Sequence, residues 1–169
     1  MAKIGLKCPV AAPITSESYG ETPKYGEGFI IGKAVSAEKN IETNDNPLYG
    51  DDAVAENDVT FASGTITLGV TDFGRTRSEN LEIQAKMLGH QIIDDNGVSI
   101  LRKGRNDEAP YLGLGYMKTK KHNNEIYYET TWLYKTQFSE FSESANTKGK
   151  NIVWQTPSIK GNIMLVEGF

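Results

Sequence analysis

Alternating hydrophobic and polar residues predict that most of this chain is β structure. Residues 29–41 and 60–70 repeat with a period of two, which is typical of strands with one buried face. Residues 151–156 and 158–166 predict a final pair of strands interrupted at Pro157, after a polar loop at 139–149. The pattern therefore predicts a mainly β fold.

Turn residues between apolar runs predict two β-hairpins. Asp94-Asp95-Asn96-Gly97 separates residues 91–93 from 98–101, and Asn-Gly is a strong hairpin signal. A longer hairpin is expected where His122-Asn123-Asn124 separates residues 111–121 from 125–138.

One segment, residues 78–88, has the pattern of an amphipathic helix. Leu81, Ala85 and Leu88 recur at helical spacing, and Ser78 is placed to cap the first turn. Gly89 follows directly and predicts the end of the helix.

Two segments show no regular period. Residues 1–28 contain three prolines and several glycines, so we expect an extended N-terminal arm that buries its apolar residues against something else. Residues 43–59 predict a loop of 17 residues. Loops longer than about 12–15 residues are uncommon in compact domains and are usually functional.

Composition limits the class of protein. A chain of 169 residues fits one domain, and we expect 1–169 to form it. The net charge of −4 argues against a general nucleic-acid binder, which neutralises phosphates with basic residues. Residues 38–58 alone carry seven acidic residues against Lys39. No apolar run approaches the ~20 residues that span a bilayer, and the lone Cys8 has no disulfide partner within the chain.

No motif in the sequence predicts catalysis. His90 and His122 are the only histidines, and we expect the first at the surface or near the helix end and the second in a turn. The acidic residues of 43–59 lack the spacing of a calcium loop, and Gly113-Leu114-Gly115 fits a bend in a strand better than a dinucleotide site. We therefore expect no enzyme, no cofactor and no metal site.

Two short basic runs stand apart from the acidic segment. Arg102-Lys103-Gly104-Arg105 and Lys118-Thr119-Lys120-Lys121 both lie near ends of predicted hairpins. They are either solvated tips or contacts for the acidic loop of another copy. Opposite patches on one molecule allow head-to-tail contacts, which generate rings or filaments.

Several segments, in this order, resemble the major tail protein that forms the tail tube of long-tailed bacteriophages (siphophages) of Gram-positive hosts. They are KAVSA (33–37), LYGDDAVAE (48–56), FASGTITLGV (61–70), LGH (88–90), APYLGLG (109–115), WLYK (132–135), NTKG (146–149) and QTPSIKG (155–161).

This resemblance implies a β-sandwich or barrel of the phage tail tube type with one flanking helix. In that family, hexameric rings stack into a hollow tube through which DNA passes without specific binding. Long hairpins form an inner barrel, while a long loop and the N-terminal arm join neighbouring subunits. The resemblance also implies contacts with tape measure, tail terminator and distal tail proteins. It implies a place in the virion tail after synthesis in the host cytoplasm, and no membrane partner.

The candidate subunit contacts come from the arm, the long loop and the basic runs. They are Ile4, Leu6, Val10, Leu48, Tyr49, Asp51, Asp52, Val54, Glu56, Arg102, Lys103, Lys120 and Lys121. We expect deletion of residues 1–12 to weaken stacking more than folding. The acidic loop fits either the lumen or the space between rings. The alternative reading is a monomeric β-sandwich that binds carbohydrate or protein.

Overall fold

The computed structural model describes residues 2–51, 53–152 and 154–168 and is mainly β, consistent with a β-sandwich. Its elements are β1 (Ala2–Ser16), β2 (Lys24–Tyr25), β3 (Phe29–Ile30), β4 (Gly32–Gly50), β5 (Ala53–Phe73), α1 (Arg77–Leu88), β6 (Gln91–Asp95), β7 (Val98–Arg102), β8 (Leu112–His122), β9 (Glu125–Ser142) and β10 (Ser158–Ile163). The two predicted hairpins are confirmed as β6–β7 and β8–β9.

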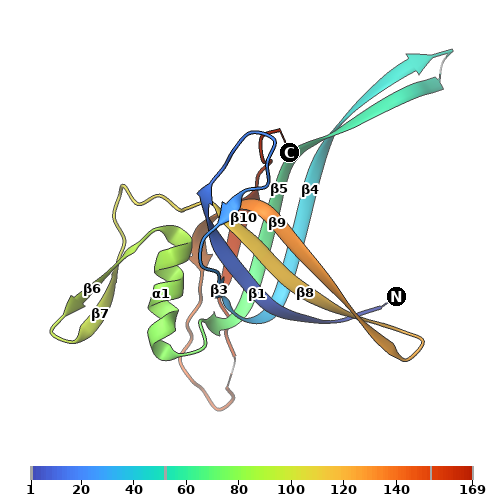
Figure 1. The fold of residues 1–169 in the computed structure, drawn as a ribbon. Coiled ribbons are helices and arrows are strands. Elements are labelled where there is room, and N and C mark those ends of the chain that lie inside the picture. The colour runs from blue at the N-terminus through green and yellow to red at the C-terminus, as the bar shows by residue number, and fades with distance from the viewer. Residues whose placement is uncertain (1, 52, 153, 169) are drawn as a thin grey trace.

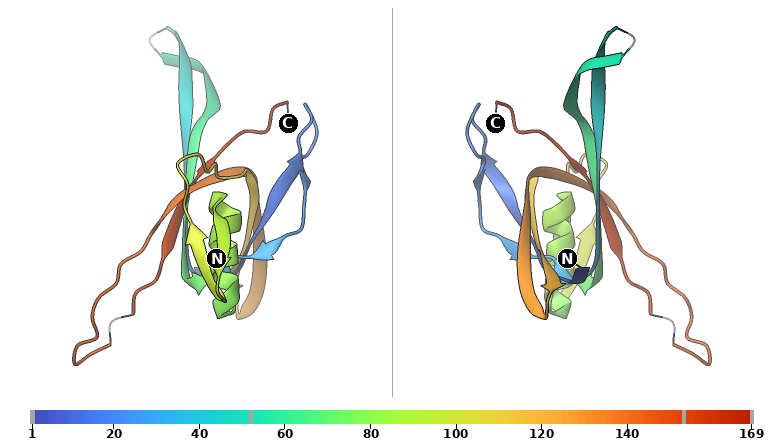
Figure 2. Two further views of the ribbon diagram at one scale, coloured as in Figure 1. Left: turned by 90° about the vertical axis from the view of Figure 1, so that its left-hand side faces the viewer. Right: turned by 90° about the vertical axis from the view of Figure 1, so that its right-hand side faces the viewer.

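One antiparallel sheet runs in the order β2-β1-β8-β9-β10-β5-β4, and β3 pairs with β1. The sheet curls, so that β1, β8 and β9 face β10, β5 and β4 across an opening that α1 fills (Figure 2). The β6–β7 hairpin is a separate sheet beside α1 (Figure 1).

The core lies between the two halves of this curled sheet. Alternate residues of β5 and β8 point inward, because successive strand side chains face opposite sides. The helix closes the core with its buried residues Ile83, Met87 and Leu88. Fully buried aliphatic residues are Ile31, between β3 and β4, and the strand residues Ile66, Leu68, Val70, Leu112, Leu114 and Ile159. Each contributes roughly 1.5–3 kcal/mol through removal of apolar surface from water.

Helix α1 confirms the predicted segment, but its cap differs. Thr76 has an extended backbone, and its Oγ1 accepts a hydrogen bond from the Glu79 N–H at 3.4 Å. Ser78, the expected cap, already lies inside the helix. Gly89 ends the helix with φ 72°, a left-handed conformation that glycine adopts without a Cβ clash.

The expected N-terminal arm is wrong for residues 2–16, which form β1. This strand pairs with β8 from Ala2↔Lys121 to Pro13↔Leu112. A register shift between Lys7 and Val10 accommodates Pro9, because a bulge tolerates a residue without an N–H donor. The arm residues therefore find much of their cover within their own chain.

The expected loop at 43–59 is also wrong, because these residues continue β4 and β5 as a long hairpin. Pairing extends from Thr43↔Phe61 to Gly50↔Ala53. Register shifts after Glu42 and after Leu48 interrupt the alternation of the two faces. The exposed ribbon has no buried face among its described side chains beyond Phe61, so no hydrophobic period marks it as a strand.

The segment between β9 and β10 also differs from expectation. Strand β9 continues to Ser142, into the polar loop expected at 139–149. The described residues of 143–157 contain no helix or strand, so the strand expected at 151–156 is wrong. The last strand is shorter than expected and ends at Ile163.

Candidate assembly surfaces

The β4–β5 hairpin projects far from the body of the molecule (Figure 1). Strand β10 pairs with β5 only as far as Gly64, so beyond this point β4 and β5 pair only with each other. Isolated two-stranded ribbons are marginally stable in water. A partner that covers this ribbon would therefore stabilise it.

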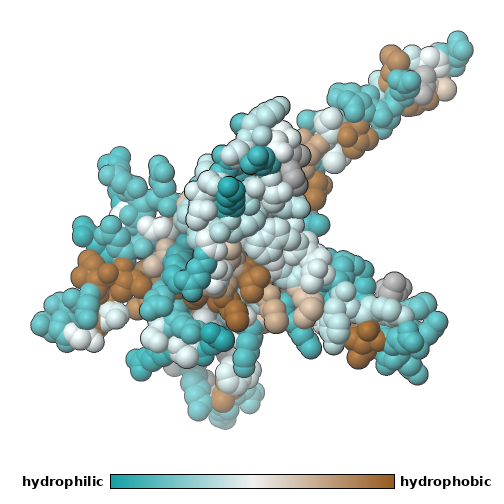
Figure 3. Space-filling view, viewed as in Figure 1, coloured by the Kyte–Doolittle hydropathy of each residue, from teal (hydrophilic) through white to brown (hydrophobic). Residues whose placement is uncertain are grey.

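The end of this hairpin, residues 42–62, is here called the hairpin tip, and its surface is both apolar and acidic. Leu48 and Tyr49 are 61% and 67% exposed, and Val54 and Val59 are 55% exposed. Around them lie Asp45, Asp51, Glu56 and Asp58, none of which has an ion pair among the described residues. Figure 3 shows apolar and polar atoms alternating along the projection. Asp52, an expected contact, lies outside the described residues.

The sheet has two open edges of opposite charge. Strand β4 forms one edge along its 19 residues, where Glu38, Glu42 and Asp45 outnumber Lys33 and Lys39. The other open edge is the start of β1, since β2 and β3 cover only its later part, and it carries Lys3 and Lys7. Unpaired backbone groups on such edges are templates for strand pairing with another chain.

The start of β1 brings Ile4 beside the expected contacts Lys120 and Lys121, because Lys3 pairs with Lys120 in register. Ile4 is 54% exposed, and Lys121 is also exposed. Lys120 is already paired with Glu129, as is Lys118 at 3.3 Å. Hydrogen bonds from Lys120 and then Lys118 lower the pKa of Glu129.

Leu6 and Val10 do not share the exposure of Ile4. Leu6 packs against the core of its own chain, and Val10 is half-buried opposite Gly115. The arm was expected to bury these residues against something outside itself, and the rest of the same chain covers them in part.

Arg102 and Lys103 lie away from the other candidate contacts, at the C-terminal end of β7. Arg102 is exposed, and Lys103 forms an ion pair with Glu140 at 2.9 Å, which lowers the pKa of Glu140. The structure does not bring these residues close to the hairpin tip. The two basic runs are thus partly neutralised within their own chain.

His90 follows the helix end as expected, but its side chain is only 7% exposed and so does not lie at the surface. Its Nδ1 lies 2.9 Å from Asp107 Oδ2, and its Nε2 lies 3.3 Å from Glu140. The pKa of Asp107 is lowered, first by the Gly104 N–H and then by the hydrogen bond with His90. Through these contacts His90 links Asp107, on the segment after β7, to Glu140 on β9.

Gly113 and Gly115 make room for an aromatic ring, and Gly113 lies at a register shift between β8 and β9. A Cβ at Gly113 would lie 2.5 Å from Trp132 Cζ2, and one at Gly115 would lie 2.6 Å from Trp132 Cε3. Tyr25 meets the same ring edge-on at 5.2 Å, and its hydroxyl accepts a hydrogen bond from Trp132 Nε1. Trp132 is therefore largely engaged within the chain.

The sequence reasoning missed the most exposed aromatic residue that the structure describes. Trp154 is 87% exposed, and Ile152 on the same segment is 59% exposed. Both lie on the segment 143–157, here called the basic loop, with the exposed Lys148 and Lys150. Because a strand was expected at 151–156, Trp154 was not recognised as exposed. A tryptophan close to lysines in a polar stretch was a usable signal of an exposed ring.

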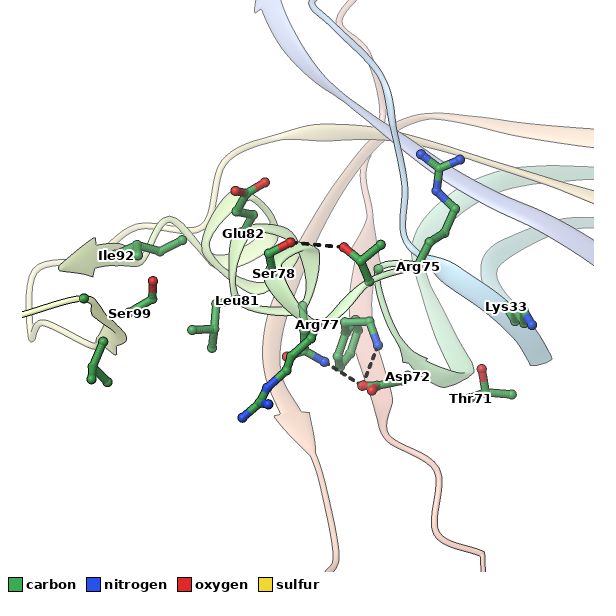
Figure 4. A pocket seen from close by; sticks show the side chains of 16 residues that line it. Lys33, Thr71, Asp72, Arg75, Arg77, Ser78, Leu81, Glu82, Ile92 and Ser99 are labelled. Atoms are coloured by element: carbon green, nitrogen blue, oxygen red, sulfur yellow. Dashed lines mark hydrogen bonds between the residues drawn. The ribbon is translucent and has the colours of Figure 1, made fainter. Parts of the chain in front are cut away.

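An open groove of about 1270 Å³ lies between α1, the end of β5 and the β6–β7 hairpin (Figure 4). Leu81, Ile92 and Val98 supply apolar lining, and Arg77 projects beside them. Asp72 accepts hydrogen bonds from Asn80 at 2.6 Å and from the Phe73 N–H. Within residues 2–51, 53–152 and 154–168, no group of three or more His, Cys, Asp or Glu side chains is arranged to hold a metal ion.

No family model matches the chain, and no curated protein matches its sequence. The part of the chain that the structure describes has no helix with the length and apolar character needed to cross a membrane.

Proposed function

We propose that this protein is a structural subunit of a bacteriophage tail tube. Copies would assemble into hexameric rings, and the rings would stack into a hollow conduit for DNA ejection. The observation that carries this proposal is the projecting β4–β5 hairpin, with apolar residues exposed and its strand edges unpaired. The resemblance of the sequence segments to tail tube proteins supports the same assignment.

Lateral contacts would join the open sheet edges. In a ring, the acidic β4 edge of one copy would lie beside the basic start of β1 in the next. Pairing of these edges would satisfy the backbone groups that each chain leaves open. Ring closure then removes all such edges, as in a closed barrel.

Acidity suits a conduit through which DNA must slide. Tight binding to DNA requires basic residues that neutralise phosphates, whereas this chain has a net charge of −4. DNA would thus pass through the lumen without specific binding. Tape measure, tail terminator and distal tail proteins would be the further partners in the virion tail, after synthesis in the host cytoplasm.

A monomeric β-sandwich that binds carbohydrate or protein is the second candidate. The observation that favours it is Trp154, because an aromatic ring exposed on a loop is a usual platform for a ligand. This function requires a chain that stays monomeric while it binds its ligand.

Negative-stain microscopy and light scattering of the purified protein over a range of concentrations separate the two candidates. We expect hollow tubes or six-fold rings above a threshold concentration. A protein that stays strictly monomeric at high concentration, alone and with tail partners, would contradict the tube proposal.

A further inference from the structure

We propose that the hairpin tip of one copy binds the basic loop of the next copy along the stack. The inference rests on the proposed self-assembly and names the contact that joins successive copies. Its partner is a second copy of this chain, and the two surfaces are residues 42–62 and 143–157.

The two surfaces lie at opposite ends of the molecule. In both views of Figure 2 the β4–β5 hairpin extends beyond one end of the body, and the basic loop extends beyond the other. The tip therefore cannot reach the loop of its own chain. A contact between them must join two copies, and each copy can use both surfaces at once.

Apolar residues on both surfaces would be covered by this contact. Leu48, Tyr49 and Val54 are more than half exposed at the tip, as are Ile152 and Trp154 on the loop. Tryptophan and tyrosine are the residues that most often dominate the binding energy of an interface. The pair Tyr49 and Trp154 would form its centre.

The charges of the two surfaces are complementary. The tip carries Asp45, Asp51, Glu56 and Asp58, whereas the stretch 144–157 contains Lys148 and Lys150 and no acidic residue. Neither lysine has an ion pair among the described residues, while Lys103, Lys118 and Lys120 are each paired with a glutamate of their own chain. Opposite charges at an interface steer the encounter and fix its register.

The groove beside α1 fits the tip less well. Its lining includes Asp72 and Glu82, which would face an acidic partner, besides the cations Lys33, Arg75 and Arg77. Arg75 already contacts Glu79 at 3.7 Å. In the basic loop the one acidic residue, Glu143, is five residues along the chain from Lys148, and the loop lies at the end of the molecule that a stacked copy would meet.

A charge exchange tests the contact. The loop variant Lys148→Glu/Lys150→Glu and the tip variant Glu56→Lys/Asp58→Lys should each melt like the wild type, because these side chains are exposed and the two tip residues lie on β5, away from the open β4 edge. Each should raise the concentration needed for tube formation about tenfold or more, since like charges would face each other. An equal mixture of the two variants should restore assembly, because copies that alternate along the stack place opposite charges at each tip–loop contact.

The matched control reverses two lysines elsewhere on the surface. Lys24→Glu/Lys160→Glu changes the net charge as the loop variant does, but both residues are exposed outside the two surfaces. It should form tubes at the wild-type concentration. Trp154→Ala removes the aromatic centre without a change of charge and should also impair assembly.

The outcomes separate this inference from the proposed function. If the wild type forms tubes and the loop variant and Trp154→Ala form them equally well, the inference is overturned and the tube function stands. If each charge variant fails but their mixture does not recover, the charge pairing is overturned. A wild type that never assembles overturns the tube function, and the contact with it.

Discussion

Glu129 shows how a single side chain couples the hairpin β8–β9 to pH. It lies between Lys118 and Lys120, and their hydrogen bonds lower its pKa in the folded protein. A carboxyl group with a lowered pKa stabilises the fold at neutral pH, because the unfolded chain binds its proton more readily. That stabilisation is lost as the pH falls through the folded pKa, below the ordinary value of about 4.

Glu129→Gln should therefore destabilise the protein at pH 7, and the difference from the wild type should shrink below about pH 4. Urea denaturation of both proteins at a series of pH values measures this. Glu38→Gln, on the exposed face of β4, is the control and should be nearly neutral. An unchanged difference at all pH values would show that the Glu129 pairs contribute nothing through its charge.

At the level of single residues, the sequence predicted the exposure of side chains on the hairpin tip better than it predicted contacts between side chains. Leu48, Tyr49 and Val54 were expected at a surface and are exposed. The side chain of His90 is covered beside Asp107, and the Trp132 ring packs over Gly113 and Gly115. Both contacts join residues that are far apart along the chain. No local pattern encodes such neighbours.

The sequence predicted strands and helices where one face of the element is buried. It did not predict them where both faces are exposed to solvent. The alternation of Ile66, Leu68 and Val70 indicates a strand because the core covers one side. The helix was found because its apolar period and Gly89 are local signals. The hairpin tip has bulges and little buried surface, and the prolines of β1 suggested loops although Pro9 sits at a bulge.

Deletion of residues 1–12 should abolish the cooperative thermal transition of the monomer. The deletion removes most of β1, including the buried Ala11, and leaves the edge of β8 uncovered. Thermal melting followed by circular dichroism measures the effect. This outcome replaces the expectation that the deletion weakens stacking more than folding. A truncated monomer with an unaltered melting transition would show that β1 is dispensable to the fold.

Leu48→Ser/Tyr49→Ser should leave the monomer folded and block tube formation. Both side chains are mostly exposed, and surface substitutions usually change stability by less than about 0.5 kcal/mol. Melting curves test the first part, and microscopy above the wild-type threshold tests the second. Normal tubes from this variant would exclude the hairpin tip as a joint. Val98→Ser, on the separate β6–β7 hairpin and 61% exposed, is a control for surface polarity.

Across the whole molecule, acidity gathers on one projection while most other charge is mixed. Residues 38–58 hold seven of the 22 acidic residues. The ion pairs near β8, β9 and the C-terminal end of β7 balance charges within the chain. The tip is thus the part of the molecule where an acidic field meets exposed apolar surface.

Salt should therefore weaken assembly without melting the subunit. The Debye length falls from about 10 Å at 0.1 M ionic strength to about 3 Å at 1 M, which screens contacts between exposed charges. The threshold for tube formation, measured by light scattering, should rise between 0.05 and 0.5 M sodium chloride. A threshold that falls with salt would show that apolar burial alone drives the contact.

The opposite placement of the hairpin and the 143–157 segment also gives any stack built from them a direction. One end of the stack would present free hairpin tips and the other end free basic loops, so the two ends would grow at different rates. An isolated peptide spanning 42–62 would cap the end that presents loops and leave the other one growing. The two ends of the stack would thus differ chemically because each chain is asymmetric, and no additional component would be needed to distinguish them.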